Sequence, residues 1–317
     1  SIGWVENSMV NKIGEASSVL SGFLKVRELG VEAVRSFFPG FTRRQCVETY
    51  AILGGVPGFW RHFEEDLSIK DNICRHILDA DAYLYEEGQR IVEEELRETG
   101  VYNTILASIA AGRRKLNDLY LHTEFSRAKI SVYLKNLMEL ELVEKVFSYD
   151  TEGKANTQKG VYRISNHFVH FYFTYLYPNL SSLERMSAED FYREYIASSL
   201  NIYVADYFSL FCKQNFERWN KQGKLPVKVS RVGEWVGKFG TIDIVAQSEE
   251  GKTILGICNW EKPVMRYDDY EWFLFCAEKA RLSADYIYLF SVHNFEERLK
   301  LEAKVKPNMK LISMDEM

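Results

Sequence analysis

The stretch Gly240-Thr241-Ile242-Asp243-Ile244-Val245-Ala246 and its successor Ile254-Leu255-Gly256-Ile257-Cys258-Asn259-Trp260 decide the fold of the C-terminal part of this chain. Both are rich in aliphatic and β-branched residues, which favour strands. The acidic turn Glu249-Glu250-Gly251-Lys252 separates them. We therefore expect two neighbouring strands of one sheet, with Asp243 as a polar residue on the first strand.

An acid on one strand, with an acid and a lysine two residues apart on the next, is the restriction-endonuclease-like metal site. Carboxylates hold a divalent cation, the cation activates water, and the lysine supports the nucleophile or the leaving oxygen. In this chain Asp243 is present, but Ile257 and Asn259 replace the second acid and the lysine. Because Asp243 alone cannot hold a catalytic magnesium ion, we expect a nuclease scaffold without its chemistry and no metal site.

Length, charge and cysteine content limit the classes of protein to which this chain can belong. The chain has 317 residues, 46% of them hydrophobic, which suggests two or three domains with sizeable cores. A net charge of -5 gives no argument for polyanion binding by the whole chain. The five cysteines have no close pairing, which favours buried thiols in a reducing compartment. No run is apolar enough for a membrane span and no signal peptide is evident, so we expect a cytoplasmic protein without a membrane partner.

Residues 98–165 have the pattern of a winged helix-turn-helix. Apolar spacing predicts helices over 102–111 and 116–120 and a third helix after Ser126, a good N-cap. Two strands, 142–147 and 160–164, follow around a polar loop. On the third helix the outward positions are Ala128, Ser131, Val132 and Lys135. Such a face suits the major groove, and lysines of the wing suit phosphates.

Residues 99–165 carry ten basic and seven acidic residues, an excess of +3. The candidate DNA-contacting residues are Arg113, Arg114, Lys115, Ser126, Arg127, Lys129, Ser131, Lys135, Lys154 and Lys159. Because the excess is small and Glu139 and Glu141 belong to the same helix region, protein binding or simple spacing of domains stays open for this unit. His167 and His170 lack further ligand-like neighbours, so we expect them to be buried or at an interface.

The C-terminal part alternates strands and helices. Ser187 opens an expected long helix that runs to about Trp219. Strands are expected near 227–231, 241–246, 253–259, 285–290 and 309–313, and helices near 268–282 and 294–304. This order predicts an α/β domain with a mixed sheet. No Gly-x-x-x-x-Gly-Lys-Ser/Thr stretch occurs, so the chain has no phosphate-binding loop of its own.

The order of units resembles the archaeal-type AAA-like ATPases, also found in anaerobic bacteria, which carry a C-terminal domain of uncharacterised function. The most specific stretches are Tyr50-Ala51-Ile52-Leu53-Gly54-Gly55-Val56-Pro57 and Gly256-x-Cys258-x-Trp260, where the family has Gly-Glu-Cys-Lys-Trp. The resemblance implies an α+β multidomain chain. Its expected parts are an ATPase-core remnant over 1–42, a helical lid over 43–97, a winged helix with an aromatic connector over 98–178, and a restriction-endonuclease-like domain over 179–317.

In that family the ATPase core, with its phosphate-binding loop and magnesium-binding acid, precedes the lid. The resemblance therefore implies that ATP and magnesium belong to a longer parent chain, with an upstream ATPase domain as partner and no cofactor here. The family often has Gly-Arg where this chain has Gly22-Phe23, and Phe-Glu where it has Phe208-Ser209. Four positions of the lost nuclease site are thus expected: Ser209, Asp243, Ile257 and Asn259.

The main hypothesis is a non-catalytic, nucleic-acid-associated C-terminal part of such an ATPase, with double-stranded DNA as partner. One alternative is an active metal-dependent DNA nuclease that uses replacement acids such as Glu234, Glu261 or Asp268. Another is a protein-interaction module, with assembly into a homo-oligomer.

Overall fold

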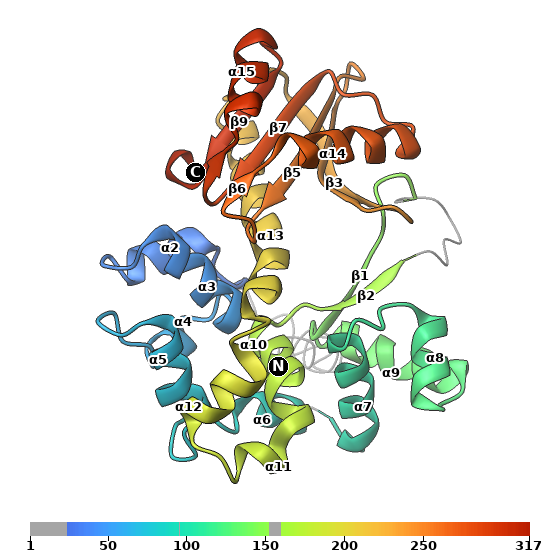
Figure 1. Cartoon of the computed structure of the whole chain (residues 1–317). Coiled ribbons are helices and arrows are strands. Elements are labelled where there is room, and N and C mark those ends of the chain that lie inside the picture. Colours follow the sequence, from blue (N-terminus) through green and yellow to red (C-terminus); the bar gives the residue numbers. More distant parts are fainter. Residues whose placement is uncertain (1–23, 95, 152–159) are drawn as a thin grey trace. The chain divides into compact units, whose positions relative to one another are not determined.

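The structure is a computed structural model, and it describes residues 24–94, 96–151 and 160–317 (Figure 1). Contacts divide the chain into two compact units. Unit 1 holds the described residues of 1–40, 52–146 and 160–198, and unit 2 holds those of 41–51, 147–159 and 199–317. The expected ATPase-core remnant over 1–42 falls largely on residues 1–23, outside the described residues.

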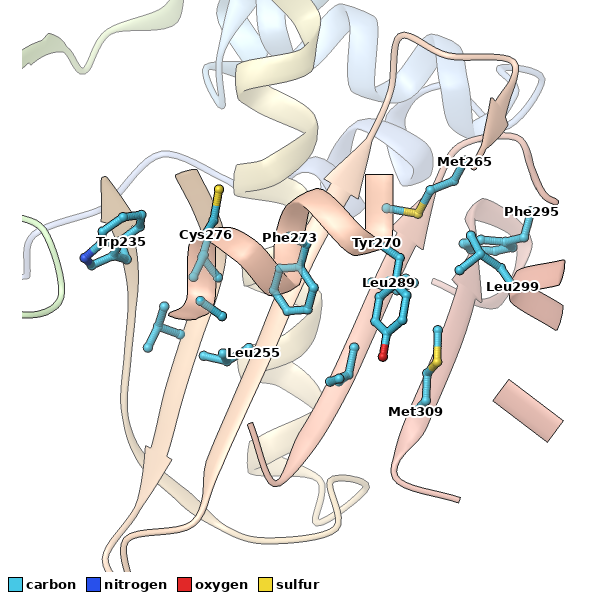
Figure 2. Packing of buried hydrophobic residues seen from close by; sticks show 14 of the residues in the cluster. Trp235, Leu255, Met265, Tyr270, Phe273, Cys276, Leu289, Phe295, Leu299 and Met309 are labelled. Atoms are coloured by element: carbon cyan, nitrogen blue, oxygen red, sulfur yellow. The ribbon is translucent and has the colours of Figure 1, made fainter. Parts of the chain in front are cut away.

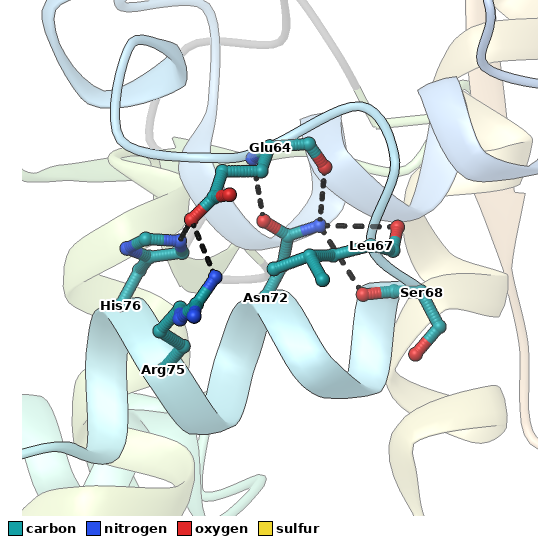
Figure 3. Close-up of polar contacts among 6 residues, drawn as sticks. All are labelled: Glu64, Leu67, Ser68, Asn72, Arg75 and His76. Carbon is teal, nitrogen blue, oxygen red and sulfur yellow. Dashed lines mark hydrogen bonds and ion pairs between the residues drawn. The ribbon is translucent and has the colours of Figure 1, made fainter.

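Unit 1 begins with short helices: α2 (Val31–Phe37), α4 (Pro57–Trp60), α5 (Ile69–Ile73), the π-helical turn η3 (Cys74–Leu78) and α6 (Glu87–Glu93). A buried amide ties the loop before α5 to that helix (Figure 3). Asn72 Oδ1 accepts from the Glu64 amide at 2.7 Å, and its Nδ2 donates to the carbonyls of Glu64, Leu67 and Ser68. Every hydrogen-bonding group of this buried side chain therefore has a partner.

Three helices and a two-stranded sheet follow in unit 1. They are α7 (Thr99–Ala110), α8 (Leu116–Thr123), α9 (Arg127–Glu139), β1 (Val143–Val146) and β2 (Val161–Ile164). The strands pair antiparallel, with Val143 opposite Ile164. The Ser126 hydroxyl accepts from the Lys129 amide, so the expected N-cap of the third helix is confirmed.

The aromatic segment after β2 forms the rest of unit 1. Its elements are α10 (His167–Phe171), η4 (Tyr172–Leu176), η5 (Tyr177–Asn179), α11 (Leu180–Leu183), α12 (Ala188–Phe191) and η6 (Tyr192–Ile196). His167 and His170 are buried, as expected. The expected helix from Ser187 to Trp219 is wrong as one element. Ser187 caps only the short α12, because the chain passes through the π-helical turn η6 before the long helix begins at Leu200.

Unit 2 is built on a five-stranded sheet with the order β3-β4-β5-β7-β9. The strands are β3 (Val229–Val236), β4 (Thr241–Ser248), β5 (Thr253–Asn259), β7 (Tyr286–Ser291) and β9 (Met309–Ser313). The pairs β3–β4 and β4–β5 are antiparallel, while β5–β7 and β7–β9 are parallel. The expected mixed sheet is therefore confirmed. The short strands β6 (Val264–Met265) and β8 (Asn294–Phe295) pair separately.

Helices cover both faces of this sheet. Helix α14 (Tyr267–Ala280) lies over a core that includes Trp235, Leu255, Phe273 and Leu289, and α13 (Leu200–Lys221) passes behind the strands (Figure 2). Helix α15 (Glu297–Val305) adds Leu299 to the same core, and the turn η7 (Met314–Glu316) follows β9. The sheet is thus a central layer between helices, as buried parallel strands require.

Two segments distant in sequence complete unit 2. Helix α3 (Arg43–Leu53) ends at Gly54, whose φ of +69° suits the residue after a helix. The Tyr203 hydroxyl donates to the Ala51 carbonyl at 3.2 Å, which fastens α3 to α13. Tyr149, from the loop after β1, is buried in the core of unit 2 and donates its amide to the Glu234 carbonyl at 2.7 Å. The units therefore divide the chain differently from the four expected domains.

Within the described part of the chain, no helix has the length and apolar character needed to cross a bilayer.

Candidate functional site

Asp243 lies near the start of β4, where that strand leaves its ladder with β5. Regular pairing runs from Ile244 opposite Gly256 to Gln247 opposite Thr253. Beyond it, Asp243 Oδ2 accepts a hydrogen bond of 2.8 Å from the amide of Cys258, and Oδ1 accepts one of 3.2 Å from the Ser209 hydroxyl on α13. The carboxylate thus joins β4 to β5 and to α13, and both of its partners are neutral donors.

The surroundings of Asp243 favour its protonated form. Burial raises its pKa to about 6, and the negative charges of Glu234 and Asp206 act in the same direction. The hydrogen bonds from Cys258 and Ser209 lower the pKa but only partly offset burial. A carboxylate that binds metal at neutral pH would instead have a nearby cation, which lowers its pKa. With a pKa of about 6, the Asp243 carboxyl is mostly ionised at pH 7 and takes up its proton in mildly acidic solution.

The two other expected site positions have structural partners. The Asn259 amide donates to the Lys262 carbonyl at 2.9 Å and to the Ser291 hydroxyl at 3.1 Å, and its oxygen accepts from the Lys262 amide at 3.1 Å. Asn259 therefore fixes the turn after β5. Ile257 packs against the core that α14 covers. Of the four expected positions, the structure brings Ser209 and Asp243 into direct contact.

Two thiols lie beside this carboxyl. Cys212 is fully buried on α13, and Cys258 follows Ile257 on β5. Burial raises the pKa of both thiols, and the negative charge of Asp243 raises it further. Since the thiolate is the nucleophilic form, these cysteines are inert near neutral pH. The expectation of buried thiols is confirmed for Cys46, Cys74, Cys212 and Cys276, while Cys258 is half-buried.

The acids that could replace the missing metal ligands differ in their surroundings. Glu234 on β3 is close enough to raise the pKa of Asp243, as is Asp206 on α13, which the sequence reasoning missed. Asp206 precedes Ser209 by three residues, so helical spacing was a signal for it. Glu261 and Asp268 are exposed. Among the described residues no group of three or more His, Cys, Asp or Glu side chains is arranged to hold a metal ion.

The outward face of α9 is a second candidate site. Ala128, Ser131, Val132 and Lys135 are exposed, while Ile130, Leu134 and Leu137 are buried. Arg127 donates to Asn117 at 2.7 Å and its guanidinium lies 4.3 Å from the centre of the Tyr120 ring. The Lys129 ammonium lies 4.5 Å from the Phe125 ring, and Lys135 pairs with Glu139 at 3.7 Å. The cations Arg127 and Lys129 at the start of α9 are therefore held beside aromatic rings, and Lys135 is paired with an acid.

The remaining expected DNA-contacting residues differ in how exposed they are. Lys115 is exposed just before α8, and Arg113 and Arg114 beside it are half-buried. The Arg114 carbonyl accepts from the Tyr162 amide at 2.7 Å, which joins this turn to β2. Lys154 and Lys159 lie outside the described residues. Sequence reasoning missed Tyr120 and Leu121, exposed on α8 by 38% and 69%, because large apolar residues were assigned to the core.

Comparisons with known proteins show similarity to proteins whose descriptions give no activity. A family model described as archaea bacterial proteins of unknown function (DUF234) matches residues 172–271. The uncharacterized protein MJECL04 of Methanocaldococcus jannaschii is 30% identical over 235 residues, which are 74% of this chain and 52% of that protein. The chain therefore spans about half the length of the curated relative it matches.

One solved structure, that of protein VC1899 from Vibrio cholerae, matches with a TM-score of 0.27 and 11% identity. The match covers 73% of this chain and 50% of that one, and at this TM-score it carries no argument about the fold. The chain is thus similar, over residues 172–271, to a family described as archaea bacterial proteins of unknown function.

Proposed function

We propose that this chain binds duplex DNA through α8 and α9, as a winged helix does, and that its sheet unit is a restriction-endonuclease-like scaffold that does not cut. The observation that carries the first part is the division of α9 into two faces. Its inward residues are buried and its outward residues are small, polar or basic. A helix of this kind fits the major groove, with small side chains near base edges and cations near phosphates.

Three contacts prepare this face for DNA. The Tyr120 ring and Asn117 hold Arg127 in place at the start of α9. The hydroxyl of Ser126 satisfies the Lys129 amide, so the N-terminal turn is formed before DNA arrives. Pre-ordered side chains lose less entropy on binding. Exposed Val132 adds an apolar group that suits a thymine methyl.

Support for the absence of cleavage comes from the partners of Asp243. Its two oxygens accept from Ser209 and Cys258, and Asn259 is committed to the turn at Lys262. The fold order of a helix, three antiparallel strands, a helix and parallel strands favours a nuclease-like scaffold. The polar positions that would do the chemistry are used for structural bonds instead.

The DNA proposal is tested by duplex binding at low ionic strength, read by fluorescence anisotropy. Arg127→Ala and Lys135→Ala should each weaken binding and lower the slope of log K against log salt by about 0.9 per lost phosphate contact. Lys70→Ala, which removes a cation outside α8 and α9 on α5, is the matched control. Absence of duplex binding at low salt contradicts the proposal and favours a protein-interaction module.

The nuclease part is tested by incubating labelled duplex with the protein and magnesium or manganese. No cleavage is expected. Metal-dependent cleavage that disappears in Asp243→Ala would instead establish the active-nuclease alternative, and Glu234→Ala would then identify the replacement acid.

ATP binding, which the resemblance implies, is proposed for a longer parent chain with an upstream ATPase domain. The match to about half the length of an uncharacterized relative supports a longer parent chain, and the ATP binding rests on the resemblance alone. The 317 residues should show no ATP turnover, and clear hydrolysis by them would contradict it.

A further inference from the structure

Three aromatic side chains form a platform on unit 2: Phe239 and Trp272 are exposed, and the half-buried Phe275 lies between them and packs against the core. Phe239 lies in the turn between β3 and β4, and the other two lie on α14. The Trp272 and Phe275 rings stack with centroids 5.1 Å apart, and the Phe275 and Phe239 rings meet edge to face at 5.6 Å. Trp272 is 54% exposed and Phe239 43%. Large rings are rarely left this open on a surface without a partner.

The turn that carries Phe239 lies close to side chains of α14 at Gly240. A Cβ atom on Gly240 would lie 3.1 Å from Cys276 Sγ and 3.4 Å from Trp272 Nε1. A Cβ atom on Gly237 would lie 1.9 Å from the Trp235 ring. A Cβ atom at Gly240 would therefore press on α14, while Gly237 leaves room for the Trp235 ring of β3. The Gly237 amide donates to the Gly240 carbonyl at 2.9 Å, which closes the turn. The platform is consequently pre-formed, since its rings project from a fixed turn and a regular helix.

Charged residues of both signs surround the platform: the exposed Glu271 directly precedes Trp272, and two lysines lie beside the phenylalanine rings. The Lys238 ammonium lies 5.8 Å from the Phe239 ring and the Lys279 ammonium lies 5.0 Å from the Phe275 ring. Glu278 belongs to the neighbouring strip of α14, where it lines a hollow of about 510 Å³ with Leu274 and Ala277. Asp268 stands at the other end of the helix, one turn before Trp272. Two cations therefore flank three rings.

We propose that this platform binds single-stranded nucleic acid, with bases stacked on Trp272 and Phe239 and phosphates near Lys238 and Lys279. Bases present flat aromatic faces and an anionic backbone, which is the chemistry that exposed rings beside lysines recognise. The site is separate from α8 and α9, which belong to unit 1, whereas every platform residue belongs to unit 2. It does not rest on the duplex-binding proposal.

The test is anisotropy of a labelled oligothymidylate with the full chain, at several salt concentrations. Trp272→Ala should weaken binding by about 5- to 150-fold, the range measured for loss of one stacked base. Trp272→Phe should retain most of the affinity because it keeps a ring. Lys238→Ala combined with Lys279→Ala should lower the salt slope by about 1.4. Leu301→Ala, at a residue 55% exposed on α15, is the matched control and should change nothing.

Arms with oligodeoxyuridylate and oligouridylate, which differ only in the sugar 2′-hydroxyl, distinguish the two possible sources of the strand. Equal affinity for both oligonucleotides supports recognition by stacking alone, and preference for one assigns the sugar that the site selects. Trp272→Ala should weaken oligothymidylate binding and leave duplex binding through α8 and α9 unchanged, which separates this proposal from the previous one.

Three results overturn the platform. One is no oligothymidylate binding at low salt, and another is equal affinity of Trp272→Ala and the unaltered protein. The third is unchanged oligothymidylate binding together with loss of self-association in Trp272→Ala by sedimentation, which assigns the rings to a protein interface.

Discussion

The Ser209 hydroxyl donates to Asp243 Oδ1 across 3.2 Å, linking helix α13 to strand β4 at the point where β4 leaves β5. Serine supplies a proton but no charge, so this contact orients the carboxyl without adding a metal ligand. The other oxygen takes the Cys258 amide, which the strand ladder leaves without its usual partner. The pair therefore serves to close a gap in the sheet.

Asp243→Asn should stabilise the protein at neutral pH. The pKa of Asp243 is about 6 in the fold against 3.8 for the ordinary group, so the folded state holds the proton more tightly. The protein therefore loses stability as the pH rises from about 4 to about 6, and this stability stays lost at higher pH. The asparagine should gain about 1–3 kcal/mol at pH 7 and nothing near pH 4. Urea unfolding at both pH values measures this.

The asparagine can keep both contacts, because Oδ1 can accept from the Cys258 amide while Nδ2 donates to the Ser209 hydroxyl. Ser209→Ala is the companion variant and should destabilise the sheet unit by about 1 kcal/mol. Equal stability of Asp243→Asn and the unaltered protein at pH 7 would show that the carboxyl is well solvated.

His170 should make unit 1 less stable in acid, whereas Asp243 makes the protein less stable as the pH rises. Burial and the positive charge of Arg114 lower the pKa of His170 to about 3, so the unfolded chain binds the proton first. Neutral His170 makes its full contribution to stability above pH 6.5. Protonation of the unfolded chain removes that contribution as the pH falls, and the loss of stability reaches about 2 kcal/mol by pH 5. His170→Gln should flatten this part of the pH dependence, followed by circular dichroism. His122→Gln, at an exposed histidine on α8, should leave the profile unchanged.

Gly88→Ala should destabilise unit 1. A Cβ atom at Gly88 would lie 2.3 Å from Tyr172 Cγ, so α6 and η4 must move apart. Overpacking of this kind costs about 1–3 kcal/mol. Gly100→Ala is the control, since nothing lies within 4 Å of its added Cβ and alanine favours the helix. Thermal unfolding should give a lower Tm for the first variant and an equal or higher one for the second.

Tyr149→Ala should destabilise the sheet unit although Tyr149 follows strand β1. Its ring is buried in the core of unit 2, and the Arg231 guanidinium lies 3.9 Å from the ring centre. Loss of a buried aromatic ring costs about 3–5 kcal/mol. Asp150→Ala, at the exposed neighbouring residue, should stay within about 0.5 kcal/mol. Equal denaturation midpoints for both variants would contradict the assignment of this loop to unit 2.

Local patterns in the sequence were enough to predict most elements. Runs of aliphatic and β-branched residues located β4, β5, β7 and β9, and Ser126 marked the start of α9, because strand propensity and caps depend on neighbouring residues. The long helix expected from Ser187 was wrong because a π-helical turn depends on packing, which leaves no simple period in the sequence.

The sequence by itself determined that Asp243 stands on a strand without a second acid or a lysine on the next, since that follows from residue identity. Only the tertiary structure decided what the carboxyl does instead. Ser209 and Cys258 reach it because α13 and β5 meet β4 in space, at separations of 34 and 15 residues. It also decided that Tyr149 belongs to the sheet unit, because contacts between residues far apart depend on how the whole chain packs.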